Sequence, residues 1–170
     1  MASLIDDLIA VLEEETICYK KLRTMADNKK DVIIQGDVPS LQKVTDDEQT
    51  VAGRLLRLEK KRMAVMEDIC LVTNKKVEEL TVSGLIEMMA SQPAEQQRLK
   101  KVSDELIEDV QAVKQINDLN KELIQQSLDF VDFTVNAINS SNQMPTGNQY
   151  QNKGGYSNHH GSRTFFDAKQ

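Results

Sequence analysis

The second quarter of this chain follows an unbroken alternation of steps of three and four residues. Ten positions between residues 41 and 72 lie on this rhythm, and all but Glu48 and Arg62 are apolar. The apolar ones are Leu41, Val44, Val51, Leu55, Leu58, Val65, Ile69 and Val72. Such a stripe places apolar side chains on one face of an α-helix that packs against other helices. It predicts one helix that is roughly 50 Å long.

Residues 4–34 carry a similar stripe, which breaks at Glu15 and Lys29. Its apolar members are Leu4, Leu8, Val11, Cys18, Leu22, Met25 and Val32. Between the two stripes, Gly36 can take the left-handed conformation that ends a helix. Asp37 can cap the next helix, and Pro39 is tolerated in its first turn. Because the link is so short, the two helices are expected to run antiparallel.

A third stripe runs from about Pro93 to Asn139. It follows Leu99, Val102, Leu106, Val113, Ile116, Asn120, Leu123, Ser127, Phe130 and Ala137, and it is broadened by Val110, Ile124, Leu128, Val131, Val135 and Ile138. The apolar face is widest in the last four turns, which indicates contact with more than one neighbour. Residues 73–92 leave open whether a separate short helix lies between the second and third stripes.

Glycine and proline are scarce where a sheet-rich fold would need them. The first 139 residues hold only three Gly and two Pro, and tight turns draw on these residues. We therefore expect an all-α fold: an elongated antiparallel helical bundle or coiled coil of three long helices plus a short fourth helix. This bundle is expected to span residues 1–139.

Residues 140–170 have a different character, rich in Ser, Asn, Gln, Gly and His. They carry a net charge of +2, which leaves −8 for the rest of a chain of net charge −6. So polar a segment cannot order itself by burying apolar surface, and a flexible, disordered tail is expected. It still holds four of the seven aromatic residues, which favours contact with a partner: Tyr150, Tyr156, Phe165 and Phe166.

Several classes of protein are disfavoured. There is no run of 18 apolar residues, so no membrane-spanning helix is expected, and the first residues do not read as a secretory signal. The acidic balance disfavours binding to nucleic acid or to anionic membranes, and a cytoplasmic protein is expected. Cys18 and Cys70 would lie roughly 24 Å apart along an antiparallel hairpin, so two free thiols are expected.

Catalytic motifs are not found. The sequence has no Gly-rich phosphate loop, no nucleophile elbow and no Cys or His pair at metal-ligand spacing. His159 and His160 are adjacent in the tail without a third ligand nearby. The acidic clusters at residues 13–15 and 46–48 are expected on solvated helix faces. We therefore expect no enzyme activity, no cofactor and no metal site.

Two features favour binding to a partner helix. Asn117 and Asn120 fall where the third stripe expects apolar residues or their neighbours. A buried Asn can fix the register of packed helices, and direct contact with a partner is the alternative. The second feature is the aromatic-bearing tail after the broad apolar face. A partner helix in a groove, with the tail folding on its arrival, fits this arrangement.

The chain resembles the FlgN family of flagellar export chaperones over residues 4–139. The most specific part is residues 119–131, Leu-Asn-Lys-Glu-Leu-Ile-Gln-Gln-Ser-Leu-Asp-Phe-Val, with a further Asn at 117. The helix from Leu8 to Glu15 and the Gly36-Asp37 turn are also similar to the family. The closing residues 166–169, Phe-Asp-Ala-Lys, are like the family's Tyr-Asp-x-x-Gly ending, with Phe for Tyr and Gln170 for Gly.

The resemblance implies a small acidic cytoplasmic chaperone without catalysis. Members of the family bind the C-terminal helical ends of the hook–filament junction proteins FlgK and FlgL, prevent their premature assembly and escort them to the export gate. The family's cargo-binding part maps here onto the last long helix from Asn117 and onto the tail. The resemblance also implies that one tail aromatic contacts the export gate, and several aromatic residues of the tail are candidates for this role.

The hypothesis for the site follows from this mapping. Cargo helices pair with the last long helix, and the tail closes over them. The candidate cargo contacts are Asn117, Asn120, Leu123, Ser127, Leu128, Val131 and Val135. The candidate tail contacts are Tyr150, Tyr156, Phe165 and Phe166.

Two alternatives stay open. The same stripes could build a self-associating coiled-coil scaffold, or the chain could be a chaperone of a virulence-type secretion system. A chaperone is expected to be a monomer or a weak dimer without cargo, whereas a scaffold would form a stable oligomer alone.

Overall fold

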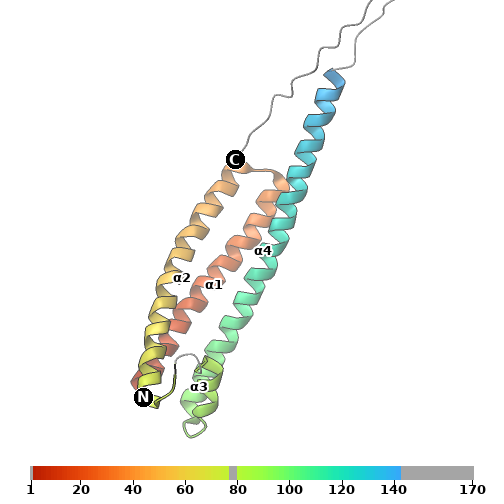
Figure 1. Ribbon diagram of the computed structural model, residues 1–170. Helices are drawn as coiled ribbons and strands as arrows, with labels where there is room; N and C mark the ends of the chain where they lie inside the picture. The colour runs from red at the N-terminus through yellow and green to blue at the C-terminus, as the bar shows by residue number, and fades with distance from the viewer. Residues whose placement is uncertain (1, 77–79, 143–170) are drawn as a thin grey trace, which may run out of the picture. The chain divides into compact units, whose positions relative to one another are not determined.

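The computed structural model describes residues 2–76 and 80–142. It contains four helices: α1 (Ala2–Gln35), α2 (Val38–Thr73), α3 (Val82–Met88) and α4 (Pro93–Asn142) (Figure 1). No strand occurs in these two ranges. The predicted all-α fold is confirmed, and α3 answers the open question about residues 73–92. None of the described helices is long and apolar enough to cross a membrane.

The chain divides into two compact units, residues 1–134 and 135–170, and α4 begins in the first and ends in the second. All helix packing described below belongs to the first unit. The expected domain boundary between residues 139 and 140 stays a prediction. The tail from residue 143 onward, with its four aromatic residues, lies outside the described part of the chain.

The turn between α1 and α2 has the predicted chemistry. Gly36 has a φ of 69°, and its N–H donates to the Ile33 carbonyl at 3.1 Å, while the Asp37 N–H donates to the Val32 carbonyl at 3.2 Å. This pair of bonds satisfies the last carbonyls of α1. The Asp37 carboxylate then accepts a hydrogen bond from the Ser40 N–H at 3.1 Å and caps α2. This bond also lowers the pKa of Asp37.

Substitutions at two glycines test this turn, because they are expected to change the free energy of unfolding in opposite directions. Gly36→Ala should lower the free energy of unfolding by about 1 kcal/mol, because a Cβ disfavours the left-handed conformation. Gly53 lies inside α2, and a Cβ at either glycine would meet no atom within 4 Å. Gly53→Ala should therefore raise the free energy of unfolding by about 1 kcal/mol. Chemical denaturation measures both, and two changes of the same sign would contradict the assignment of the turn.

Ion pairs join α1 to α2, and two of them use all four residues that interrupt the first two predicted stripes. Glu15 accepts from Arg62 at 3.2 Å, and Lys29 donates to Glu48 at 2.7 Å. In both pairs the two residue numbers add up to 77, so one number falls as the other rises. The two helices thus lie side by side in opposite directions (Figure 1).

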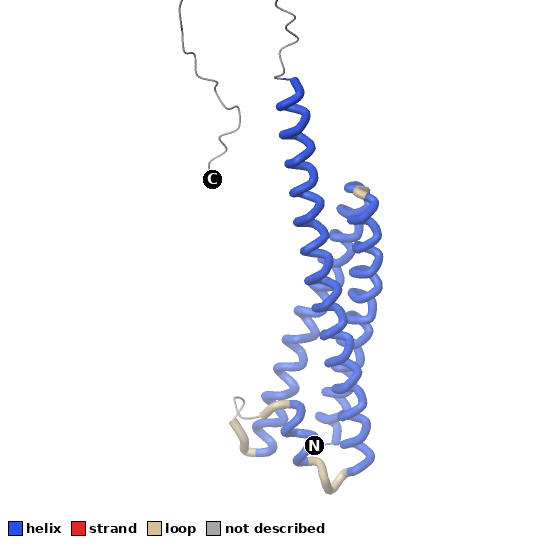
Figure 2. Tube along the Cα trace, turned by 90° about the vertical axis from the view of Figure 1, so that its right-hand side faces the viewer, coloured by secondary structure: helices blue, strands red, loops and turns tan. Residues whose placement is uncertain are grey.

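α1 also contacts α4, and along this seam the residue numbers rise together. Asp6 pairs with Arg98 at 3.0 Å, and Arg23 pairs with Asp109 at 3.4 Å. α1 and α4 therefore run in the same direction, and Figure 2 shows the three long helices side by side. Knobs-into-holes packing between them stays a prediction.

The apolar core of the first unit lies where all four helices meet. Both figures place α3 near the N-terminus of α1, at the end opposite the α1–α2 turn. The core residues are Ile5, Leu8, Ile9, Leu12, Ile69, Cys70, Leu80, Leu85, Met89 and Leu99. The short helix α3 is held there by Leu85, which is 0% exposed, and it starts with a Thr81 cap on the Gly84 N–H at 3.0 Å.

Burial departs from the predicted stripes at particular residues. Val72, the last member of the second stripe, is 57% exposed, whereas Cys70 is buried in its place. In α1, Ile5 and Ile9 are buried although they lie off the stripe, because α1 packs against two helices rather than one. Cys18 is buried as expected, and both cysteines are free thiols.

Candidate functional site

The second half of α4 exposes large apolar side chains close together. In the first unit, Leu128, Phe130, Val131 and Phe133 are between 54% and 70% exposed. Val135, which belongs to the second unit, is 49% exposed. Single exposed apolar residues are common on protein surfaces, whereas several large ones along one stretch of helix are typical of a surface that binds another molecule. Three of these residues were predicted as cargo contacts: Leu128, Val131 and Val135.

Asn120 differs from the other predicted contacts because it lies inside the bundle. It is 3% exposed, and its amide Nδ2 donates to the Ala26 carbonyl of α1 at 2.8 Å. Its Oδ1 is buried without a hydrogen-bond partner. This bond joins α4 to the backbone of α1 at one register, so the geometry favours the register role over direct contact with a partner.

The remaining predicted contacts are distributed along the same helix. Asn117 is exposed, and Leu123 is half-buried. Ser127 is exposed, and its hydroxyl donates to the Leu123 carbonyl at 2.9 Å; the Thr134 hydroxyl donates to the Phe130 carbonyl at 2.8 Å. Because both hydroxyls are satisfied by their own helix, a partner could cover them without leaving a buried donor unpaired.

Sequence reasoning missed Phe133, which is 70% exposed, and gave Phe130 no role in the site. The sequence pattern could have identified both residues. A second alternation of three and four runs through Leu119, Leu123, Phe130 and Phe133, with Gln126 as its one polar member. The broad stripe of α4 concealed this second line.

The charges beside the exposed apolar group are all acidic. Between residues 122 and 142 the charged residues are Glu122, Asp129 and Asp132, with no Lys, Arg or His. Asp129 accepts a hydrogen bond from the Gln125 amide at 3.0 Å and stays on the exposed side of the helix. A partner with Lys or Arg beside its apolar face would be complementary in charge.

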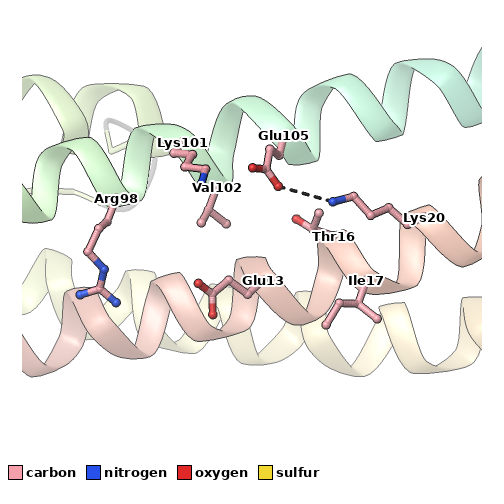
Figure 3. Close-up of a pocket in the computed structure, with 8 residues that line it drawn as sticks. All are labelled: Glu13, Thr16, Ile17, Lys20, Arg98, Lys101, Val102 and Glu105. Carbon is pink, nitrogen blue, oxygen red and sulfur yellow. Dashed lines mark hydrogen bonds and ion pairs between the residues drawn. The ribbon is translucent and has the colours of Figure 1, made fainter.

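A hollow of about 440 Å³ lies lower on the molecule, between α1 and α4 (Figure 3). Its lining is mostly charged: Glu13, Thr16, Ile17, Lys20, Arg98, Lys101, Val102 and Glu105. Lys20 reaches across it to Glu105 at 3.5 Å, as the dashed line in Figure 3 shows. The hollow is thus a polar seam between two helices. Among the residues with a described position, no group of His, Cys, Asp or Glu could hold a metal ion.

The fold and the exposed group together define a class of protein: a chain whose described residues form helices and leave an apolar helix surface available for binding. The family model of the FlgN protein matches residues 1–158. The chain therefore belongs to the FlgN family, and this membership indicates a flagellar export chaperone. No curated protein and no solved structure matches the chain.

Proposed function

We propose that this chain is a cytoplasmic chaperone that binds the C-terminal helical region of hook-associated proteins of the FlgK and FlgL type. It prevents these proteins from assembling before export and escorts them to the export gate. The observation that carries the proposal is the exposed apolar surface of α4, formed by Leu128, Phe130, Val131 and Phe133. A helix with an apolar stripe is the partner that such a surface fits.

The size of the exposed side chains supports this reading. Phe130 and Phe133 are 69% and 70% exposed, although large aromatic side chains usually gain most from burial. Aromatic residues are also enriched among those that dominate binding energy at interfaces. The surface is therefore better suited to a partner than to solvent.

The predicted contacts on α4 divide into four groups under this proposal. Leu128, Val131 and Val135 touch cargo directly, and Leu123 and Ser127 border them. Asn117 lies on the exposed side of α4 and is a rim contact. Asn120 holds α4 on α1 through the Ala26 carbonyl and so keeps the surface in place. The tail contacts Tyr150, Tyr156, Phe165 and Phe166, and a gate contact among them, remain proposals.

The mass of the protein in solution separates this function from a scaffold. Light scattering or sedimentation over a range of concentrations should show a monomer or a weak dimer without cargo. Addition of a purified hook-associated protein should produce a complex with one copy of each chain. A stable oligomer that forms without cargo and ignores its addition would instead support a coiled-coil scaffold.

A further inference from the structure

The exposed apolar surface of α4 is too wide for one partner helix. It consists of two lines along the helix, which we call the leucine line (Ile124, Leu128 and Val131) and the phenylalanine line (Leu119, Leu123, Phe130 and Phe133). Leu123 and Ile124 are half-buried, and the other five residues are exposed. At 3.6 residues per turn, the two lines point about 140° apart around the helix axis. A helix packed against one line therefore leaves much of the other line in solvent.

The strip between the two lines continues the buried side of α4. Leu99, Val113 and Asn120 are at most 7% exposed and are separated by multiples of seven residues. The next two positions with this spacing are Ser127 and Thr134, the residues whose hydroxyls are bonded to their own helix. The centre of the exposed surface is thus the continuation of the face that α4 already buries in the bundle.

The phenylalanine line continues the side of α4 that meets α1. Arg98 and Asp109 of α4 pair with Asp6 and Arg23 of α1. Phe133 lies five heptads after Arg98, and Phe130 lies three heptads after Asp109. A partner helix on this line would therefore pack against the same side of α4 as α1 does in the bundle.

The leucine line continues the opposite side. Ile107 and Val110 line a hollow that α4 shares with Leu55 and Leu56 of α2. Leu128 and Val131 each lie three heptads after these two α4 residues. A partner helix on this line would therefore pack against the same side of α4 as α2 does in the bundle.

We infer that this part of α4 binds two amphipathic helices at once, one on the leucine line and one on the phenylalanine line, both supplied by the cargo protein. The inference rests on the proposed function and specifies its partner. Together with α4 the two helices would repeat the three-helix arrangement that α1 and α2 complete lower down. Along the two lines, from residue 118 to residue 132, four acidic residues accompany one basic residue: Asp118, Glu122, Asp129 and Asp132 against Lys121. Because the surroundings are mainly acidic, the partner helices carry Lys or Arg next to their apolar stripes.

Two double variants test the two lines separately. Phe130→Gln with Phe133→Gln removes the phenylalanine line, and Leu128→Gln with Val131→Gln removes the leucine line. Gln is a good helix former, and all four side chains are at least 54% exposed, so both variants should keep the parent's far-UV circular dichroism. Each variant is titrated with two probes: a full-length FlgK-type protein and a peptide of its C-terminal helix alone.

The expected result depends on the probe. Each double variant should weaken binding of the full-length cargo at least tenfold, while the single-helix peptide should be sensitive to only one of them. If the phenylalanine variant binds full-length cargo like the parent and only the leucine variant is weakened, the second helix is ruled out and the proposed function stands. If neither variant is weakened, the proposed function fails as well.

A second copy of the chain is the competing occupant of the phenylalanine line. Light scattering of the phenylalanine variant without cargo addresses it. A parent that dimerises, together with a variant that does not and that still binds cargo normally, would overturn the inference. An unchanged mass together with weakened cargo binding would support it.

Discussion

Replacing Arg62 with methionine is expected to lower the free energy of unfolding by about 2 kcal/mol at neutral pH, because it leaves the Glu15 carboxylate buried without a partner. Arg62 Nε donates to Glu15 Oε1 at 3.2 Å, and the Glu15 side chain is 5% exposed. Breaking a fully buried pair costs about 3 to 5 kcal/mol. The smaller figure allows for screening by solvent, since the Arg62 side chain is 34% exposed.

The destabilisation should depend on pH in a defined direction. Burial raises the pKa of Glu15 above its ordinary value of 4.5, and Arg62 counters part of this effect. The folded state therefore binds the proton more tightly than the unfolded state, so the charged carboxylate costs stability at neutral pH. Without Arg62 the pKa rises further. The difference in free energy of unfolding between the parent and Arg62→Met should thus become smaller as the pH falls toward 4.5.

Matched variants keep this prediction specific. Arg54 of the same helix pairs with Glu14 at 3.2 Å, but both side chains are more than 40% exposed. Arg54→Met should change the free energy of unfolding by less than about 0.5 kcal/mol. Glu15→Leu combined with Arg62→Met should restore most of the lost stability, because no charge is then buried. Equal effects of Arg54→Met and Arg62→Met would contradict the account.

The helices and the first turn could be predicted because their signals are local. The alternation of three and four fixes a helix face within one segment, and the Gly36 and Asp37 chemistry acts within a few residues. The pairing of Glu15 with Arg62 and of Lys29 with Glu48 was not recognised. Each residue interrupts its own stripe, and only the antiparallel register brings each pair together.

Burial was harder to predict where a helix has two neighbours. The stripe predicted for α1 describes contact with a single neighbouring helix. Ile5 and Ile9 lie off that stripe and were therefore not predicted to belong to the core, which they help to form. Among the predicted cargo contacts, the pattern could not tell that Leu128, Val131 and Val135 are exposed while Asn120 is buried, since all four are compatible with one broad face. The hydrogen bond from Asn120 to Ala26 makes the distinction, and it joins residues 94 positions apart.

Loss of binding is the second large effect that we expect. Leu128→Asp combined with Val131→Asp should weaken binding to a hook-associated protein roughly 100-fold, because two charges would enter an apolar interface. Both side chains are 54% exposed, so the isolated variant should stay folded and helical. Met63→Asp with Leu71→Asp is the matched control, since it removes two exposed apolar side chains of α2, which are 55% and 81% exposed.

The most direct test of the account is therefore one calorimetric titration of a purified hook-associated protein into the parent, the α4 variant and the α2 control, with circular dichroism of each. All three chains should be equally helical, and only the Leu128→Asp, Val131→Asp variant should lose binding. Binding that survives in that variant would contradict the assignment of the surface, and unfolding of that variant would show that the two residues belong to the core.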